Sequence, residues 1–234
     1  GYNSSWNGTT LIYSSNGLHW VASSNGQFTG TGGNGTSIAY GNGVWVATGI
    51  DIATSNSILY STDGSNWSAT SNSFLGAGQG VDFHNGLWVA TGSDTDSNTL
   101  KYSLDGSNWE NAVSGGLFTD GGKQVRYVGS YWLAGGYDAT ATIKYSSDGS
   151  NWSNATGGFE ILGPAPYYAS DFSYNGSNLY VAVGYAGDYA NTIVTSSNAI
   201  DWTLNTTGNF NLEAKTVQYE PYLEPDTISV ILSN

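Results

Sequence analysis

Apolar residues along the chain fall in short runs and alternating pairs, and polar turn residues separate them at close intervals. Pairs such as Ile38/Tyr40 lie two positions apart, which places both members on one face of a strand. The dipeptides between the runs are Asn-Gly at 42 and 85 and Asp-Gly at 63, 105 and 148. Such dipeptides suit two-residue hairpin turns, where positive φ angles are needed. The pattern predicts an all-β chain of short antiparallel strands.

A segment that ends in tryptophan recurs five times, and a segment resembling WVATG alternates with it. The copies are YSSNGLHW, YSTDGSNW, YSLDGSNW, YSSDGSNW and TSSNAIDW, with tryptophans at 20, 67, 109, 152 and 202. Their spacing of 42 to 50 residues is typical of one blade of a β-propeller. Each repeat divides into four short strands with turn signals between them, which predicts a four-stranded antiparallel meander.

The two ends of the chain carry different parts of the repeat. The chain starts with third-strand material at 10–14 and ends with a first and a second strand at 216–234. Pairing these ends would complete a fifth sheet and leave no open sheet edge. The expected fold is therefore one five-bladed β-propeller domain over 1–234. A blade formed from about 1–30 and 212–234 would close it two-plus-two.

The turn between the third and fourth strands carries a recognisable motif, Ser-x-Asp-Gly-x-x-Trp. It resembles the Asp-box, or BNR-type, repeat of sialidase-like propellers, although that motif has one more residue between Asp and Gly. Asn16 and Asn198 replace the aspartate in two of the five copies. The resemblance implies a structural turn at the blade periphery. The architecture is also similar to that of five-bladed tachylectin-type lectins, without a shared motif.

Charge and composition restrict the partners. Five basic residues against 18 acidic residues give a net charge of −13, which repels nucleic acid and anionic lipid surfaces. The chain has no cysteine, and no apolar run is long enough for membrane insertion. It begins at Gly1, without an initiator Met or a signal peptide, and reads as a processed or excised piece. Low charge with abundant Ser, Thr and Asn predicts an extracellular location or a cell or virion surface.

The sequence offers no specific catalytic constellation. A sialidase needs several arginines to hold a substrate carboxylate, and Arg126 is the one arginine here. The two histidines, His19 and His84, match no nucleophile–base pattern. Arg126 and Asp82 occupy equivalent first-strand positions in adjacent repeats, which predicts an ion pair or a polar channel site. We expect no catalytic residues and no cofactor.

One segment, Asp94-x-Asp96-x-Asn98, starts like a calcium-binding loop. This segment lacks the glycine and the distal glutamate of a complete calcium loop, so we expect no metal site.

The loops between second and third strands combine tyrosines with acids, a composition that suits sugar binding. The candidate ligand-binding residues are Tyr2, Asp51, Asp94, Tyr137, Asp138, Tyr185 and Asp188. Each loop between fourth and first strands carries one phenylalanine, for which interblade packing is the simpler explanation. These are Phe28, Phe74, Phe118, Phe159 and Phe210.

Two insertions, 159–170 and 220–226, interrupt the repeat on opposite faces of the expected disk. Stiff loops with apolar and aromatic groups suit contacts with a partner, including head-to-tail stacking of copies. The candidate contact residues are Ile161, Leu162, Tyr167, Tyr168, Tyr222 and Leu223. The alternative is that these loops cover the closure blade.

Eight Asn-x-Ser/Thr sequons are present, close to the number expected by chance, and they mark candidate glycosylation sites. They are Asn3, Asn7, Asn34, Asn66, Asn151, Asn154, Asn175 and Asn205. The first functional hypothesis is a non-catalytic extracellular module that assembles with itself on a surface or filament. The second is a lectin-like protein that binds glycans at several sites, and an extracellular glycoside hydrolase is a distant third.

Overall fold

The computed structural model is built from β-strands. It describes residues 9–30, 32–95, 98–115, 117–159, 167–186, 192–205, 207, 213–219 and 228–231. Every helix or strand assigned within these ranges is a strand, which confirms the all-β prediction. Within the same ranges no helix is long and apolar enough to cross a membrane.

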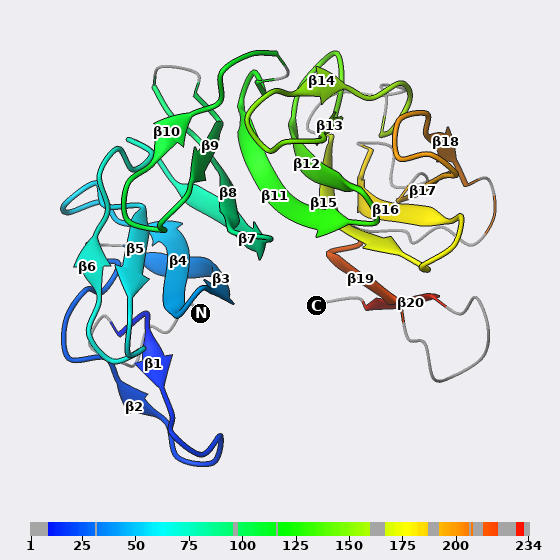
Figure 1. The fold of residues 1–234 in the computed structure, drawn as a ribbon. Coiled ribbons are helices and arrows are strands. Elements are labelled where there is room, and N and C mark those ends of the chain that lie inside the picture. The colour runs from blue at the N-terminus through cyan, green and yellow to red at the C-terminus, as the bar shows by residue number, and fades with distance from the viewer. Residues whose placement is uncertain are drawn as a thin grey trace. The chain divides into compact units, whose positions relative to one another are not determined.

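Four complete sheets each follow the predicted meander, with strands hydrogen-bonded in chain order (Figure 1). Blade 1 contains β3 (Asn34–Gly41), β4 (Val44–Ile50), β5 (Ile58–Ser61) and β6 (Ser68–Ala69). Blade 2 contains β7 (Gly78–His84), β8 (Leu87–Gly92), β9 (Leu100–Ser103) and β10 (Glu110–Asn111). Blade 3 contains β11 (Gly121–Val128), β12 (Tyr131–Tyr137), β13 (Ile143–Ser146) and β14 (Ser153–Asn154). Blade 4 contains β15 (Tyr168–Tyr174), β16 (Tyr180–Tyr185), β17 (Ile193–Ser196) and β18 (Thr203–Leu204).

Two further sheets have two strands each and come from the ends of the chain. One pairs β1 (Ile12–Tyr13) with β2 (Val21–Ala22), and the other pairs β19 (Thr216–Tyr219) with β20 (Ile228–Ile231). They correspond to the third and fourth strands and to the first and second strands of the repeat. Four blades and two half-blades make a five-bladed β-propeller fold.

The chain divides into two compact units, 1–112 and 113–234. The first unit holds β1–β2 and blades 1 and 2, and the second holds blades 3 and 4 and β19–β20. The expected pairing of the two half-blades would join these units, and it stays a prediction.

Within each unit the apolar core lies between successive sheets. In the first unit, Val46 and Ile58 of blade 1 pack with Val81, Trp88 and Trp109 of blade 2. In the second unit, a corresponding cluster joins blades 3 and 4. The recurring phenylalanines at 28, 74, 118 and 159 are at most 1% exposed, in keeping with the predicted packing role, whereas Phe210 lies outside the described residues.

The two kinds of predicted hairpin turn differ. Asn42–Gly43 and Asn85–Gly86 have positive φ at both positions and join the first strand to the second as two-residue turns, as predicted. The Asp-Gly prediction is wrong. In blade 1 the connection from β5 to β6 covers 62–67, and Gly64 has positive φ whereas Asp63 does not. The turn is wider because the aspartate accepts hydrogen bonds from residues two and three positions further along.

Every complete blade carries a bulge in its first strand, seen as a register shift of one residue. In blades 3 and 4 the shift skips Lys123 and Ser170. A bulge redirects the side chain of the extra residue. Lys123 and Ser170 both lie at the edge of the tyrosine cluster described below.

Candidate functional site

Where a tryptophan-ending segment carries an aspartate before its glycine, that aspartate organises its own turn. In blade 3, Asp148 Oδ1 accepts hydrogen bonds from the amides of Ser150 at 2.9 Å and Asn151 at 2.8 Å, and Oδ2 accepts one from Asn151 Nδ2 at 2.9 Å. Ser146 Oγ accepts from the amide of Gly149 at 2.8 Å. The indole of Trp152 donates to the Gly149 carbonyl at 3.1 Å and closes the turn. The carboxylate is therefore occupied by its own backbone, the structural role expected from the resemblance.

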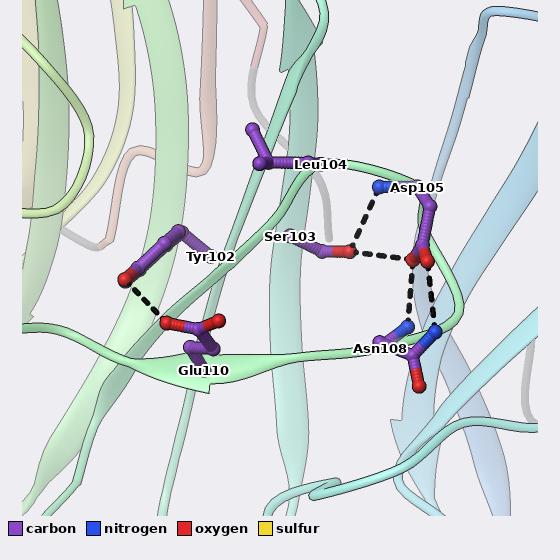
Figure 2. A pocket seen from close by; sticks show the side chains of 6 residues that line it. All are labelled: Tyr102, Ser103, Leu104, Asp105, Asn108 and Glu110. Atoms are coloured by element: carbon purple, nitrogen blue, oxygen red, sulfur yellow. Dashed lines mark hydrogen bonds between the residues drawn. The ribbon is translucent and has the colours of Figure 1, made fainter.

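Figure 2 shows the corresponding turn in blade 2, which lines a small surface pocket of about 180 Å³. Asp105 holds Asn108 there through both carboxylate oxygens. Across the pocket, the Tyr102 hydroxyl donates to Glu110 Oε2 at 2.7 Å. The pocket is thus lined by polar groups that already have partners.

In the turn of blade 4 the aspartate and the asparagine exchange positions. Asn198 stands at the aspartate position, and its Oδ1 accepts from the amides of Ile200 and Asp201 at 2.9 and 2.8 Å. Its Nδ2 donates to Asp201 Oδ2 at 2.8 Å. The Asp–Asn pair of the other turns is therefore present in reverse order. Ala199 adopts φ 67° where the other turns have glycine.

Hydrogen bonding controls the ionisation of these aspartates. Burial by itself would raise the pKa of Asp148, but the bonds donated by Asn151 and Ser150 outweigh it and lower this pKa. The same balance lowers the pKa of Asp105. At Asp63 the bonds from Asn66 are the main cause of a lowered pKa. All three carboxyls are anionic at neutral pH.

Two buried lysines, Lys144 and Lys101, each lie in a cluster with an aspartate and an asparagine. Lys144 Nζ donates to Asn154 Oδ1 at 2.7 Å and to Asp138 Oδ2 at 3.0 Å, and it lies 4.8 Å from the centre of the Phe118 ring. The side chains of Lys144 and Asp138 are 1% and 4% exposed. Asp138 also accepts from the amide and the hydroxyl of Thr140, both at 2.8 Å.

Blade 2 repeats this arrangement. Lys101 Nζ donates to Asn111 Oδ1 at 2.7 Å and lies 3.4 Å from Asp94 Oδ2. It also donates to Asn72 Oδ1 at 3.2 Å and lies 5.3 Å from the centre of the Phe74 ring. A polar pocket of about 370 Å³, lined in part by Asp94, Asn111 and Lys101, opens beside this cluster. The sequence analysis did not identify either cluster, although the third strands TLKYS and TIKYS each contain a lysine.

Each lysine is paired directly with its asparagine across two antiparallel strands. Lys101 is opposite Asn111, and Lys144 is opposite Asn154. The equivalent cross-strand pairs elsewhere contain no polar side chain. They are Ile12–Ala22, Leu59–Ala69 and Val194–Leu204.

Arg126 makes its ion pair within the second unit. Its Nε donates to Asp171 Oδ1, and its second contact to Asp171 Oδ2 spans 3.4 Å. Asp171 is 1% exposed and also accepts from Thr216 Oγ1 at 2.7 Å and from the Val217 amide at 3.1 Å. One carboxylate thus links the first strands β11, β15 and β19. The predicted pairing of Arg126 with Asp82 would cross between the two units and stays a prediction.

Three tyrosines gather where β12, β15 and β16 end or begin. The Tyr168 ring lies 4.6 Å from that of Tyr137 and 6.0 Å from that of Tyr185, measured between centroids. Lys123 Nζ lies 5.2 Å from the centre of the Tyr168 ring. Burial, with the nearby charge of Glu213, raises the pKa of both Tyr137 and Tyr168. The structure thus brings together the predicted Tyr137 and Tyr185.

The acids predicted to bind ligand have internal partners instead. Asp51 accepts from Thr29 Oγ1 at 3.0 Å and from the Thr54 amide at 3.0 Å, and it is 5% exposed. Asp94 and Asp138 hold the buried lysines. Asp51 and Asp138 are thus held by contacts inside the fold, whereas Asp94 lines the polar pocket beside Lys101 and its Oδ1 accepts no hydrogen bond from the described residues. Sugar binding by these acids stays a prediction. Tyr2 and Asp188 lie outside the described residues.

The candidate partner-contact residues are mostly not described. Ile161, Leu162, Tyr222 and Leu223 lie outside the described residues. Tyr167 is half-buried, and Tyr168 is 8% exposed within the tyrosine cluster. The Tyr168 ring packs on the rings of Tyr137 and Tyr185, and its contact with a partner stays a prediction.

The sequons differ in accessibility. Asn66, Asn151 and Asn154 are exposed, Asn205 is half-buried and Asn175 is 7% exposed. The Oδ1 of Asn34 is buried. Asn3 and Asn7 lie outside the described residues.

In the described part of the chain, no group of three or more His, Cys, Asp or Glu side chains could hold a metal ion. Asp96, the middle acid of the calcium-like segment, lies outside that part.

Comparison with known proteins gives a likeness of fold. No family model matches the chain, and no curated protein sequence matches it. Among solved structures, YCF48 bound to D1 peptide aligns with 82% of this chain and 59% of its own at 15% identity and a TM-score of 0.51. The computationally designed Ika8 protein aligns with 82% of this chain and 67% of its own at 11% identity and a TM-score of 0.46. The chain spans about three fifths of the length of YCF48. The structural likeness to YCF48 agrees with the propeller fold.

Proposed function

We propose that this chain is a non-catalytic structural module that assembles with copies of itself on an extracellular, cell or virion surface. The observation that carries the proposal is that the recurring charged groups of the chain make their hydrogen bonds internally. The turn aspartates bind their own backbone, and the buried lysines bind aspartate and asparagine within their own blades. These charged groups are therefore taken up by contacts within their own blades, which supports a structural role over a catalytic one.

The turn geometry also supports relating these repeats to the Asp-box propellers. In that relationship the aspartate closes a turn at the blade periphery, and Asp148 and Asp105 do so here. The shortened motif fits the same role because the carboxylate still reaches the amides two and three residues further along.

A second candidate function, carbohydrate binding, rests on the tyrosine cluster. Tyr137 and Tyr185 are half-buried and flank Tyr168, and Glu213 accepts a hydrogen bond from Ser170 Oγ at 3.3 Å nearby. Aromatic rings can cover the apolar face of a sugar while a carboxylate accepts its hydroxyl protons. This candidate predicts one site at the cluster. The acids of the other blades are buried, which weakens the case for several equivalent sites.

Light scattering over a concentration series, electron microscopy and a glycan array separate these proposals. The structural proposal predicts polymers that grow with concentration and a blank array. A chain that stays monomeric at every concentration and binds one class of glycan would overturn it. Binding that is lost in Tyr185→Ala but kept in Tyr102→Ala, a tyrosine away from the cluster, would support the carbohydrate site.

A further inference from the structure

Lys144 and Asn154 are placed as a nucleophile and an electrophile. They face each other across β13 and β14, and the lysine nitrogen lies 2.7 Å from the amide oxygen of the asparagine. Because the carbonyl carbon is bonded to that oxygen, the amine is within reach of the atom that an amine attacks. Reacting groups held in contact gain a large rate advantage over the same groups in solution.

Stability alone does not account for a lysine at this position. The same cross-strand position holds Leu59–Ala69 in blade 1 and Val194–Leu204 in blade 4. Replacing a buried ion pair by apolar side chains is often neutral or stabilising. An apolar pair at this position is therefore sufficient for the fold. Blades 2 and 3 both have a lysine and an asparagine there instead.

Burial brings the lysine part of the way toward its neutral, reactive form. Phe118 lies against the amine, and Asp138 Oδ2 accepts a hydrogen bond from the amine at 3.0 Å. Burial lowers the pKa of the Lys144 ammonium, although the neighbouring Asp138 partly opposes this. Burial by itself would raise the pKa of Asp138, but hydrogen bonds from Thr140 and Lys144 lower it, so the proton moves to Asp138 only transiently. A desolvated lysine beside a proton acceptor is an activated amine nucleophile. Asn154 is itself an exposed residue, so a small leaving group has a route to solvent.

We propose that Lys144 and Asn154 condense into an intramolecular isopeptide bond that locks the two outer strands of blade 3 together. Asp138 takes one proton from the Lys144 ammonium, and the free electron pair of Nζ forms a bond to Cγ of Asn154. A second proton passes from Nζ to Nδ2, the Cγ–Nδ2 bond breaks, and ammonia leaves. Ammonia recovers the proton from Asp138 and departs as ammonium. No oxidant, metal or cofactor takes part, and the product is an amide between the two side chains.

Blade 2 contains the same three groups in Lys101, Asn111 and Asp94. Its amine–oxygen distance is also 2.7 Å, but Asp94 is further away, at 3.4 Å, and Asn72 competes for the amine at 3.2 Å. We expect this pair to react as well, and more slowly than the pair in blade 3. Neither reaction depends on the structural role proposed above, because a monomer that binds glycans could carry the same bonds.

Intact mass measurement of the folded chain tests the proposal directly. The protein is produced in a host without N-glycosylation, because Asn154 is also a sequon. We expect the mass to be lower than that of the sequence by one ammonia, and by a second as blade 2 reacts. Trypsin cleaves after lysine and arginine, of which the chain has five, so the peptide map is simple. Cleavage after Lys144 should be lost and an internally linked peptide should appear.

Three variants identify the bond. Lys144→Met and Asn154→Ala should each restore one ammonia, and Asp138→Ala should slow bond formation without unfolding the chain, with rescue by Asp138→Glu. The combination Lys144→Val with Asn154→Leu copies the pair of blade 4 and serves as a folded control without reactive groups. A wild-type mass equal to that of the sequence, in folded protein, would overturn the proposal. A loss of ammonia that persists in the double variant Lys101→Met/Lys144→Met, in which neither pair can react, would also overturn it, because it would report succinimide formation at an Asn-Gly turn.

Discussion

The reversed turn of blade 4 allows a test of what the Asp–Asn pair contributes. Asn198 donates to Asp201 at 2.8 Å, whereas in blade 3 the donor and acceptor positions are exchanged. Asn198→Asp alone would bring two carboxylates together in place of that hydrogen bond. Adding Asp201→Asn would re-create the arrangement of Asp148 and Asn151.

The expected cost follows from two contributions. A hydrogen bond to a charged group contributes about 1.5–3 kcal/mol, and loss of it is partly compensated by water at this exposed turn. Repulsion between two carboxylates about 4 Å apart costs about 1 kcal/mol in a water-like dielectric. Since the side chains can rotate apart, we expect Asn198→Asp to lower the free energy of unfolding by about 2 kcal/mol. The double variant should lie within about 0.5 kcal/mol of the wild type.

Urea unfolding followed by tryptophan fluorescence measures this cycle, since the chain has nine tryptophans. The four proteins are the wild type, Asn198→Asp, Asp201→Asn and the double variant. A double variant as unstable as the sum of the single variants would refute the reasoning, because the two positions would then act independently. An Asn198→Asp variant as stable as the wild type would refute it too.

Three further changes should have measurable effects on urea unfolding. Hydrogen bonds lower the pKa of Asp148 in the folded state, so its contribution to the free energy of unfolding is present above about pH 4 and is lost as pH falls toward the folded pKa. The free energy of unfolding of Asp148→Ala should therefore fall less than that of the wild type between about pH 5 and about pH 2. Equal losses in the two proteins would contradict this. Gly149→Ala should cost about 1 kcal/mol, because φ there is 77° and Ala199 shows that the turn accepts alanine, whereas an unfolded variant would contradict that comparison. Asp171→Ala should cost about 3 kcal/mol, because it leaves the Val217 amide and Arg126 without this acceptor, and a loss below about 1 kcal/mol would show that the link between first strands is dispensable.

The repeat made the sheets predictable from sequence. The spacing of the tryptophans and the alternation of first-strand residues set the number and order of strands, because strand periodicity depends on local side-chain pattern. The same reasoning failed at the Asp-Gly turns. There, Asp63 reaches amides beyond the dipeptide and widens the loop, which dipeptide preference alone does not encode.

The candidate sites were less predictable because they depend on contacts between blades and across strands. Asp51 and Asp94 were correctly placed in loops, but their burial follows from packing that a single sequence does not show. Lys101 and Lys144 appear in the repeat as polar residues in an apolar strand. That departure was the available signal for both lysine clusters, and the opposing asparagines were visible only once the register was known.

Blade 1 differs from the later blades in the exposure of one apolar first-strand residue. In later first strands the residue equivalent to Ile38 packs on the preceding sheet, as Val81 does with Val46 and Val217 does with Val183. Ile38 is 52% exposed, whereas Val81 is 4% exposed. Closure would supply the first and second strands of the preceding sheet, which are β19 and β20.

The register of the complete blades predicts which residues meet in the closed blade. In blade 3, Arg126 pairs with Leu133, which in turn pairs with Tyr145. In the C-terminal sheet the residue paired with Gln218, the equivalent of Arg126, is Ser229. Tyr13 of β1 is the repeat equivalent of Tyr145, so Tyr13 should lie opposite Ser229.

A disulfide between these two positions tests the five-bladed closure most directly, since the chain contains no cysteine. Directly opposed strand residues lie about 4.5–5.5 Å apart, within the range that a disulfide bridges. The account predicts that Tyr13→Cys/Ser229→Cys forms an intramolecular disulfide in the monomer under mild oxidation. Ile12→Cys/Ser229→Cys should not, because its two side chains would point to opposite faces. Free thiols in the first variant, or crosslinks only between chains, would contradict a propeller closed by its own two ends.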